Sequence, residues 1–264
     1  MKNDIFNIFA FEIKTMIKSK WLISFSVFYF LTGLALFMLS GGGSKLVLNL
    51  FTFSSLLIPV IALFYNANFL YNEKKFIEML LSQPVKRSSI YWGIYLSLTV
   101  SLSVILTISG IFAFIFSGSG FEILDKVIIL FLLNIFTVFI FTGISFLTVF
   151  TLPDRAKGFI ALIFIWVFAF IAYDAIILVT SYLLSDYPVE NYIFAAVISN
   201  PVDISRIIMM MQFDISALMG YTAAIYKMQF GESGSLFILF GILLLWVVLP
   251  GMLAKKLFTR RDFL

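Results

Sequence analysis

The chain has 264 residues, a net charge of +4, and neither cysteine nor histidine. Hydrophobic residues make up 62% of it and charged residues 12%, which is too little polar material to cover a soluble globule, so the composition is that of an integral membrane protein. Without cysteine or histidine, this sequence excludes disulfides, imidazole catalysis and the ordinary zinc and haem ligand sets. An enzyme on this chain would need carboxylates alone. We expect no catalytic residue, metal site or cofactor on it.

The first segment, residues 3–20, predicts an amphipathic helix ahead of the first apolar run. Its apolar residues recur at helical spacing, at Ile5, Phe9, Ile13 and Ile17. Such a helix lies along the inner leaflet of a membrane as an interfacial elbow. Two interpretations stay open: a simple anchor, or an elbow that also touches a cytoplasmic partner.

Six apolar runs are long enough to cross the hydrocarbon core of a bilayer, which needs about 20 helical residues. They are residues 21–40, 46–70, 92–116, 127–152, 159–183 and 235–254. The sequence therefore predicts an all-α polytopic membrane protein with six transmembrane helices.

Between the second and third runs lies a short charged segment, residues 73–90. Its first part predicts two turns of amphipathic helix, with Phe76, Ile77, Leu80 and Leu81 on one face. Pro84 prevents the helix from running much beyond Ser82. This pattern favours a docking surface for another protein over a catalytic site.

Basic residues predict the orientation, because Lys and Arg near span ends stay on the cytoplasmic side. The N-terminal segment, residues 73–90, the fourth connection and the tail at 255–264 together hold 14 of the 18 basic residues. Both termini are therefore predicted to be cytoplasmic. The positive charge reflects this topology and contact with anionic lipid, and it does not indicate nucleic-acid binding.

Residues 184–234 form a long connection on the opposite, extracytoplasmic side, where we expect one or two interfacial or re-entrant helices. A helix start is predicted from Asn200 as the cap, Pro201 in the first turn and Asp203 near the positive end of the dipole. Arg206 stands three residues from Asp203. The run Met209-Met210-Met211 suggests either apolar packing or a copper(I) site, and packing is favoured because consecutive helical residues point about 100° apart.

Asp174 is an ionisable residue deep within the fifth run. A carboxylate there costs about 2.5–3.5 kcal/mol on insertion scales, which calls for a partner, a water-filled cavity or protonation. It either lines a transport path or fixes the bundle by a hydrogen bond, for example with Asn134.

The order of these parts resembles the ABC-2 family of ATP-binding-cassette permeases, the type V exporter-like fold. Members carry a Glu-x-Leu-Leu-x-x-Pro-x-x-Arg run after the second span, which forms a cytoplasmic coupling helix. It is matched here by Glu78, Leu80, Leu81, Pro84 and Arg87. The tail Phe258-Thr259-Arg260-Arg261-Asp262 is also similar to the common family ending, whereas Lys75-Phe76 departs from the usual Gly-Thr.

Within the family, three stretches resemble the NosY-type permeases of the transporter that matures the copper centre of nitrous oxide reductase. They are residues 81–85, 172–174 and 200–206. The resemblance implies a homodimer in a bacterial cytoplasmic membrane, with two copies of a separate cytoplasmic ATPase that binds ATP and Mg. It also implies a periplasmic β-helical partner and export of a sulfur-containing species.

The same resemblance assigns roles to residues. The groove of the ATPase would be filled by four apolar residues, Phe76, Ile77, Leu80 and Leu81. The polar rim around them would be formed by Glu73, Glu78 and Arg87, and a further contact with the ATPase would come from Asp154 and Arg155. Asn200, Pro201, Asp203 and Arg206 would form an outer gate or partner site.

Two alternatives remain. An ABC-2 exporter of another cargo, such as a peptide, drug or lipid-linked molecule, fits the same motifs. An ion-coupled carrier would use Asp174 as its proton site and would need no ATPase.

Overall fold

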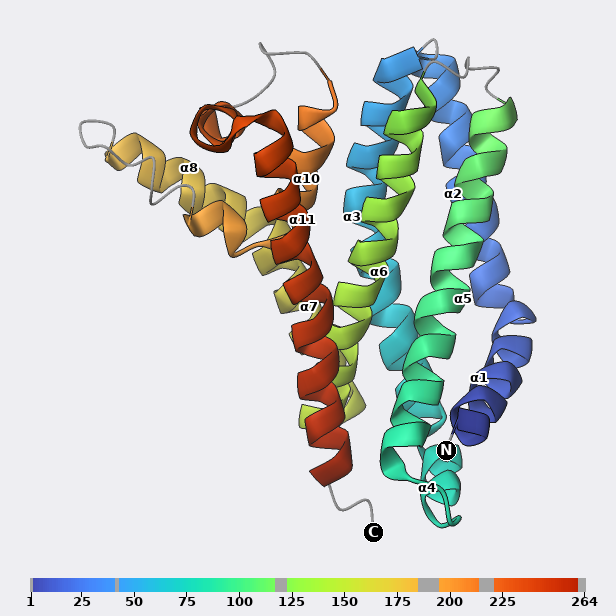
Figure 1. Cartoon of the computed structure of the whole chain (residues 1–264). Helices are drawn as coiled ribbons and strands as arrows, with labels where there is room; N and C mark the ends of the chain where they lie inside the picture. Colours follow the sequence, from blue (N-terminus) through green and yellow to red (C-terminus); the bar gives the residue numbers. More distant parts are fainter. Residues whose placement is uncertain (1, 41–42, 117–122, 185–194, 214–220, 261–264) are drawn as a thin grey trace.

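The computed structural model describes residues 2–40, 43–116, 123–184, 195–213 and 221–260, and within them the chain forms helices and no strand. Figure 1 shows their arrangement. The first helices are α1 (Lys2–Ile17), α2 (Lys20–Ser40), α3 (Gly43–Asn72), α4 (Lys74–Leu81), α5 (Arg87–Phe116) and α6 (Leu124–Thr151). They are followed by α7 (Arg155–Val167), the π-helical turn η2 (Phe168–Ala172), α8 (Tyr173–Leu183), α10 (Pro201–Met211) and α11 (Tyr221–Arg260).

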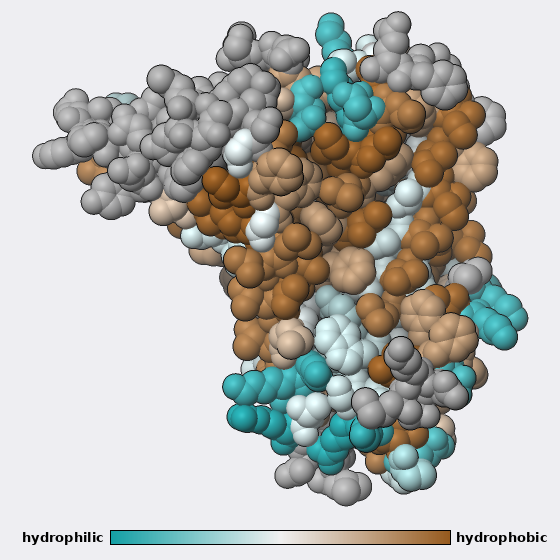
Figure 2. All heavy atoms as spheres, viewed as in Figure 1, coloured by the Kyte–Doolittle hydropathy of each residue, from teal (hydrophilic) through white to brown (hydrophobic). Residues whose placement is uncertain are grey.

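Six helical segments of the described residues are long and apolar enough to cross a membrane, which confirms the predicted fold class at this level. They are Lys20–Ser40, Gly43–Asn72, Arg87–Ile115, Leu124–Thr151, Arg155–Leu183 and Leu236–Arg260. Figure 2 shows the same property on the surface, where an apolar band lies between two hydrophilic ends. The molecule is a polytopic helical protein with the surface of a membrane protein.

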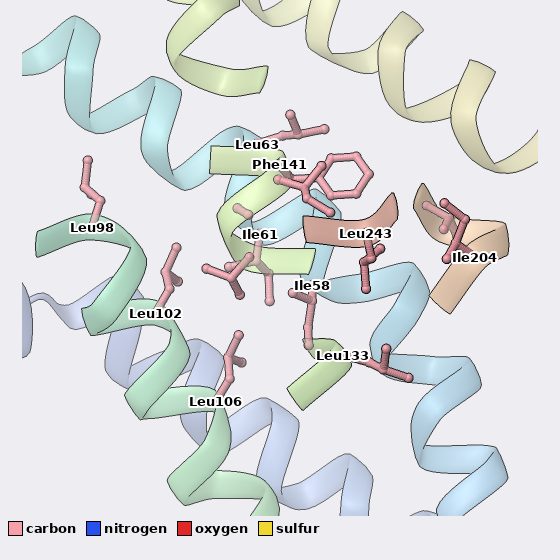
Figure 3. Packing of buried hydrophobic residues seen from close by; sticks show 14 of the residues in the cluster. Ile58, Ile61, Leu63, Leu98, Leu102, Leu106, Leu133, Phe141, Ile204 and Leu243 are labelled. Carbon is pink, nitrogen blue, oxygen red and sulfur yellow. The ribbon is translucent and has the colours of Figure 1, made fainter. Parts of the chain in front are cut away.

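The core lies between α3, α5 and α6. Helix α6 packs against both α3 and α11, while α1 and α2 pack against α5. Leucines four residues apart on α5 project from one side of that helix, and buried residues of α3, α6, α10 and α11 fill the interior, including Ile58, Leu133, Ile204 and Leu243 (Figure 3).

One end of the molecule collects α1, α4 and the last turns of α11 (Figure 1). The guanidinium of Arg87, at the start of α5, donates to the carbonyl oxygen of Thr259 at 3.2 Å and so ties the third span to the end of the sixth. Helix α11 begins at Tyr221 and runs to Arg260, so the expected span 235–254 is only the apolar middle of a longer helix. Hydropathy marks the apolar run, whereas backbone hydrogen bonding continues into polar residues at both ends.

The fifth span is not one continuous α-helix, which differs from the prediction for 159–183. The π-helical turn η2 separates α7 from α8. No residue of α8 is buried, and this helix leans away from the bundle in Figure 1. A single π-turn leaves no mark on hydropathy, which is why the interruption was not predictable.

Candidate functional site

Helices α8 and α10 bring Asp174, Asp203 and Arg206 together. We call these three residues the carboxylate–arginine cluster. The Nη1 atom of Arg206 on α10 lies 3.0 Å from Oδ2 of Asp174 on α8 and 3.1 Å from Oδ1 of Asp203 on its own helix. The i, i+3 spacing on α10 places Asp203 and Arg206 on one face. One cation therefore bridges two acids from different elements.

Asn200 joins this cluster to the π-helical turn. Its Oδ1 accepts from Val202 N at 3.1 Å, which confirms the predicted cap of α10, with Pro201 in the first turn. Its Nδ2 donates to the carbonyl oxygen of Ala169 at 2.8 Å and to Oδ2 of Asp203 at 3.1 Å. Because a π-turn interrupts the α-helical pairing of carbonyls, a side-chain donor at Ala169 stabilises the turn.

Asp203 is the buried member of the cluster, with 5% of its surface exposed. Burial raises the pKa of Asp203 above its ordinary value, Asp174 raises it further, and Arg206 and Asn200 lower it. Two carboxylates share one guanidinium here, so the cluster is short of positive charge. It can accept a proton or a cation.

A cavity of about 470 Å³ lies beside the cluster, between α6, α7, η2, α8, the start of α10 and α11. Its wall is mostly apolar and aromatic and includes Phe141, Phe164, Phe168, Tyr173, Asn200 and Trp246. The volume is in the range of small-molecule sites. Tyr173 and Asn200 connect the cavity to the cluster, because Tyr173 precedes Asp174 and Asn200 contacts Asp203.

Asn134 is not the partner of Asp174, which corrects the predicted pair. The buried Asn134 amide on α6 lies 3.5 Å from the hydroxyl of Tyr29 on α2. Asp174 instead pairs with Arg206, which is 32 residues away in the chain. Arg206 lies on α10, outside the apolar runs, so the sequence gives no sign that it reaches a residue within the fifth span.

Helix α10 is more buried than an interfacial helix on an outer surface would be. All of its residues except Arg206 and Met210 are buried. Met209 and Met211 lie in the apolar core, as simple packing requires. Among the described residues, no group of three or more acidic side chains is placed to hold a metal ion.

The apolar face of α4 is turned partly inward, which corrects one predicted docking residue. Ile77 is 4% exposed and belongs to the chain's own core. Phe76 stacks on Phe11 of α1 with ring centroids 5.9 Å apart, and Leu80 and Leu81 are half-buried against the core. An amphipathic pattern shows that a face is covered, but it does not distinguish a partner from the rest of the same chain.

The outward side of α4 and its following turn is polar, apart from Met79 and Pro84. It presents Lys74, Lys75, Met79, Gln83, Pro84 and Lys86 as exposed residues. Glu78, at the edge of this side, lies 3.7 Å from Lys74, and Glu73 is the half-exposed residue before the helix. This surface, together with Glu73 and Glu78, is called the α4 surface below.

Asp154 and Arg155 serve the local structure at the same end. Asp154 caps α7 by accepting from Lys157 N at 2.9 Å. The two terminal nitrogens of Arg155 donate to Asn72 at 3.0 Å and Asn68 at 2.7 Å on α3. These contacts fix where the fifth span starts relative to the second.

Glu12 is a buried acid that the sequence did not single out. It lies on the side of α1 that faces the bundle, near Ile8 and Met16, and only 3% of it is exposed. Burial and then the like charge of Glu73 raise the pKa of Glu12 to about 7. The four-residue spacing of Ile8, Glu12 and Met16 places Glu12 on one helix face with two apolar residues, which indicates burial. The apolar series from Ile5 to Ile17 marks a neighbouring face as the buried one, so Glu12 was not predicted to be buried.

Many of the predicted residues gather in two places, the carboxylate–arginine cluster with its cavity and the α4 surface, whereas Asn134, Ile77, Asp154 and Arg155 serve contacts within the chain. No protein-family model matches this chain, and comparison with curated proteins finds no significant match. A family assignment for this chain is therefore a proposal.

Proposed function

We propose that this chain is the membrane subunit of an ATP-driven transporter of the ABC-2 type, coupled to a separate ATPase. The observation that supports the proposal is α4, a short helix between two spans, at the same end of the molecule as α1 and the last turns of α11 (Figure 1). Its sequence contains the Glu78 to Arg87 run that resembles the coupling helix of that family. The exposed α4 surface is where the ATPase would bind.

The contacts of α4 offer a route for mechanical coupling. Phe76 rests on Phe11, so displacement of α4 pushes on α1, which packs along α5. Arg87 begins α5, after the short turn that follows α4, and donates to the carbonyl oxygen of Thr259 near the end of α11. In a homodimer with two ATPases, closure of the ATPases would move both copies of α4 and transmit the movement to three helices of each chain.

The cargo follows from the resemblance alone. Similarity to the NosY-type permeases makes a sulfur-containing species for copper-centre assembly the first cargo to test, with a periplasmic β-helical protein at the outer end. Another ABC-2 cargo remains the alternative. An ion-coupled carrier is less favoured, because Asp174 is paired with Arg206 and is not an isolated proton site.

The direct test is co-purification in mild detergent from the native host, followed by mass spectrometry. We expect an ATP-binding-cassette ATPase with the unmodified chain and its loss from the double variant Lys75→Glu, Met79→Asp. Both residues are exposed on α4, so the fold should survive. The matched control is Lys45→Glu, an exposed lysine at the start of α3.

Aspartate at Leu80 or Leu81 is a poorer test, because both side chains pack against the core and their loss would disturb α4 itself. Failure to recover any ATPase with the unmodified chain, or equal recovery with the α4 double variant, would contradict the proposed function. Recovery of a periplasmic β-helical protein as well would favour the sulfur-export role.

A further inference from the structure

The cavity beside the carboxylate–arginine cluster opens toward the side of the molecule that a bilayer would surround. Two of its wall residues, Phe164 and Phe168, are 70% and 54% exposed. Both lie in the span Arg155–Leu183. Phe164 is nine residues beyond Arg155, which places it about 14 Å along the helix and within the hydrocarbon core.

The polar groups of the cavity wall are already engaged within the protein. Tyr173 donates its hydroxyl to the carbonyl of Ala196, and Ser199 donates to Ala195. Asn200 uses its amide for Ala169, Asp203 and Val202. A molecule inside the cavity therefore gains contact with apolar and aromatic surface and needs no hydrogen bonds there.

The charged neighbour of the cavity lies toward the far interface. Asp174 is nineteen residues beyond Arg155, about 28 Å along the span by helical rise, and its side chain is partly exposed. Arg206 is shared between Asp174 and Asp203, so this end of the site has more acid than base. It suits a positive group better than a negative one.

We propose that this cavity binds the hydrocarbon chain of a membrane amphiphile that enters sideways from the bilayer, with its cationic headgroup against Asp174. Acyl chains are what surrounds Phe164 and Phe168 at that depth, and the apolar wall fits them. The site needs no ATPase, so it goes beyond the proposed function and can succeed or fail separately from it.

Trp246 in the cavity wall supplies a direct readout. The purified full-length chain in lipid nanodiscs is titrated with a single-chain amphiphile that carries bromine on its chain and a trimethylammonium headgroup, and tryptophan quenching is recorded. Trp246→Phe identifies the part of the signal that comes from the cavity, since the sequence has four tryptophans. We expect that part to saturate.

Filling the cavity should weaken the saturable binding. Ile144→Phe adds bulk from α6 and Ala169→Phe adds it from η2, so one remains informative if the other misfolds. Each variant should weaken binding of the amphiphile by about tenfold or more, because the hydrocarbon chain of the amphiphile loses apolar contact area. Ile163→Phe, on an exposed position of α7 outside the cavity wall, is the matched control and should leave binding unchanged.

The headgroup is tested with the same brominated chain bearing a sulfate. We expect Asp174→Asn to weaken the trimethylammonium probe about fivefold, as for a partly exposed ion pair, and to leave the sulfate probe unchanged or better bound. Two outcomes would overturn the proposal: quenching that does not saturate, and quenching that the filling variants leave unchanged. Either would mean that the quenching comes from probe in the surrounding bilayer, or that a second copy of the protein covers the cavity. Equal binding of both probes would overturn the headgroup assignment.

Discussion

Arg206 connects α8 to α10 through charge. Its guanidinium is within 3.1 Å of both Asp203 and Asp174, so it connects α10 to α8. Asp203 is buried, and a buried carboxylate without a counter-ion is costly. Removing Arg206 would thus cost stability mainly by leaving the buried carboxylate of Asp203 without a counter-ion, and less by the loss of the attraction itself.

Replacing Arg206 with leucine should therefore destabilise the protein by about 1–3 kcal/mol, because Asp203 would keep its burial and lose its cation. The measurement is thermal unfolding in detergent, followed by tryptophan fluorescence. The double variant Arg206→Leu, Asp203→Asn should recover much of the loss, since the amide carries no charge. Equal instability of single and double variants would show that Arg206 acts through packing instead.

Glu12 makes the packing of α1 against the helix bundle depend on pH. Its pKa is about 7 in the folded chain, against an ordinary value of 4.5. An acid with a raised pKa favours the folded state while it is protonated, so its contribution falls as pH rises from about 4.5 to about 7 and stays low above that. We expect α1 to be held firmly in mild acid and more loosely in mild base.

Because the sequence contains no cysteine, two introduced cysteines can be spin-labelled without background. Labels at Phe6 on α1 and Met79 on α4 occupy exposed positions. Their distance distribution, measured by pulsed electron paramagnetic resonance, should broaden between about pH 5 and about pH 9. In the Glu12→Gln background it should stay narrow throughout, and broadening there would implicate another group.

At the scale of helices, α6 and α11 approach closely at a glycine. A Cβ atom at Gly143 would lie 2.8 Å from Cβ of Pro250 and 3.0 Å from the backbone nitrogen of Gly251. Neither neighbour can rotate away, because one is in a ring and the other is main chain. The hydroxyl of Tyr91 donates to the carbonyl of Gly251 at 2.6 Å and fixes the same place from α5.

Gly143→Ala should thus destabilise the protein by about 1–3 kcal/mol through overpacking, despite the higher helix propensity of alanine. Gly241→Ala is the control, because nothing lies within 4 Å of a Cβ atom at Gly241, and it should be neutral or slightly stabilising. Thermal unfolding of both variants in the same detergent decides the matter. A stable Gly143→Ala protein would mean that α11 can shift away from α6.

Features of the structure that depend on neighbouring residues could be predicted from the sequence, whereas contacts between distant residues could not. The cap at Asn200 and the start of α10 depend on neighbouring residues, and both were predicted correctly. The pairing of Asp174 with Arg206 spans 32 residues and depends on how α8 and α10 pack, which periodicity does not encode. Ile77 shows the same limit on α4, since its apolar face was visible in the sequence but its cover, the chain's own core, was not.

For the whole molecule, the distribution of charge and apolar surface follows one axis. An apolar band separates two hydrophilic ends (Figure 2), and α1, α4 and the end of α11 lie at one of them (Figure 1). That end holds most of the basic residues, which is the arrangement expected for a cytoplasmic face. The proposed ATPase contact at α4 requires this orientation.

The orientation is open to a labelling test in intact cells. Lys75→Cys on α4 and Lys45→Cys at the start of α3 are exposed and lie on opposite sides of the predicted membrane. A membrane-impermeant maleimide should label Lys45→Cys in intact cells and Lys75→Cys only after permeabilisation, because the basic residues keep α4 inside. The reverse pattern would place α4 outside, where no ATP-driven motor could reach it, and the proposed function would fail together with the predicted topology.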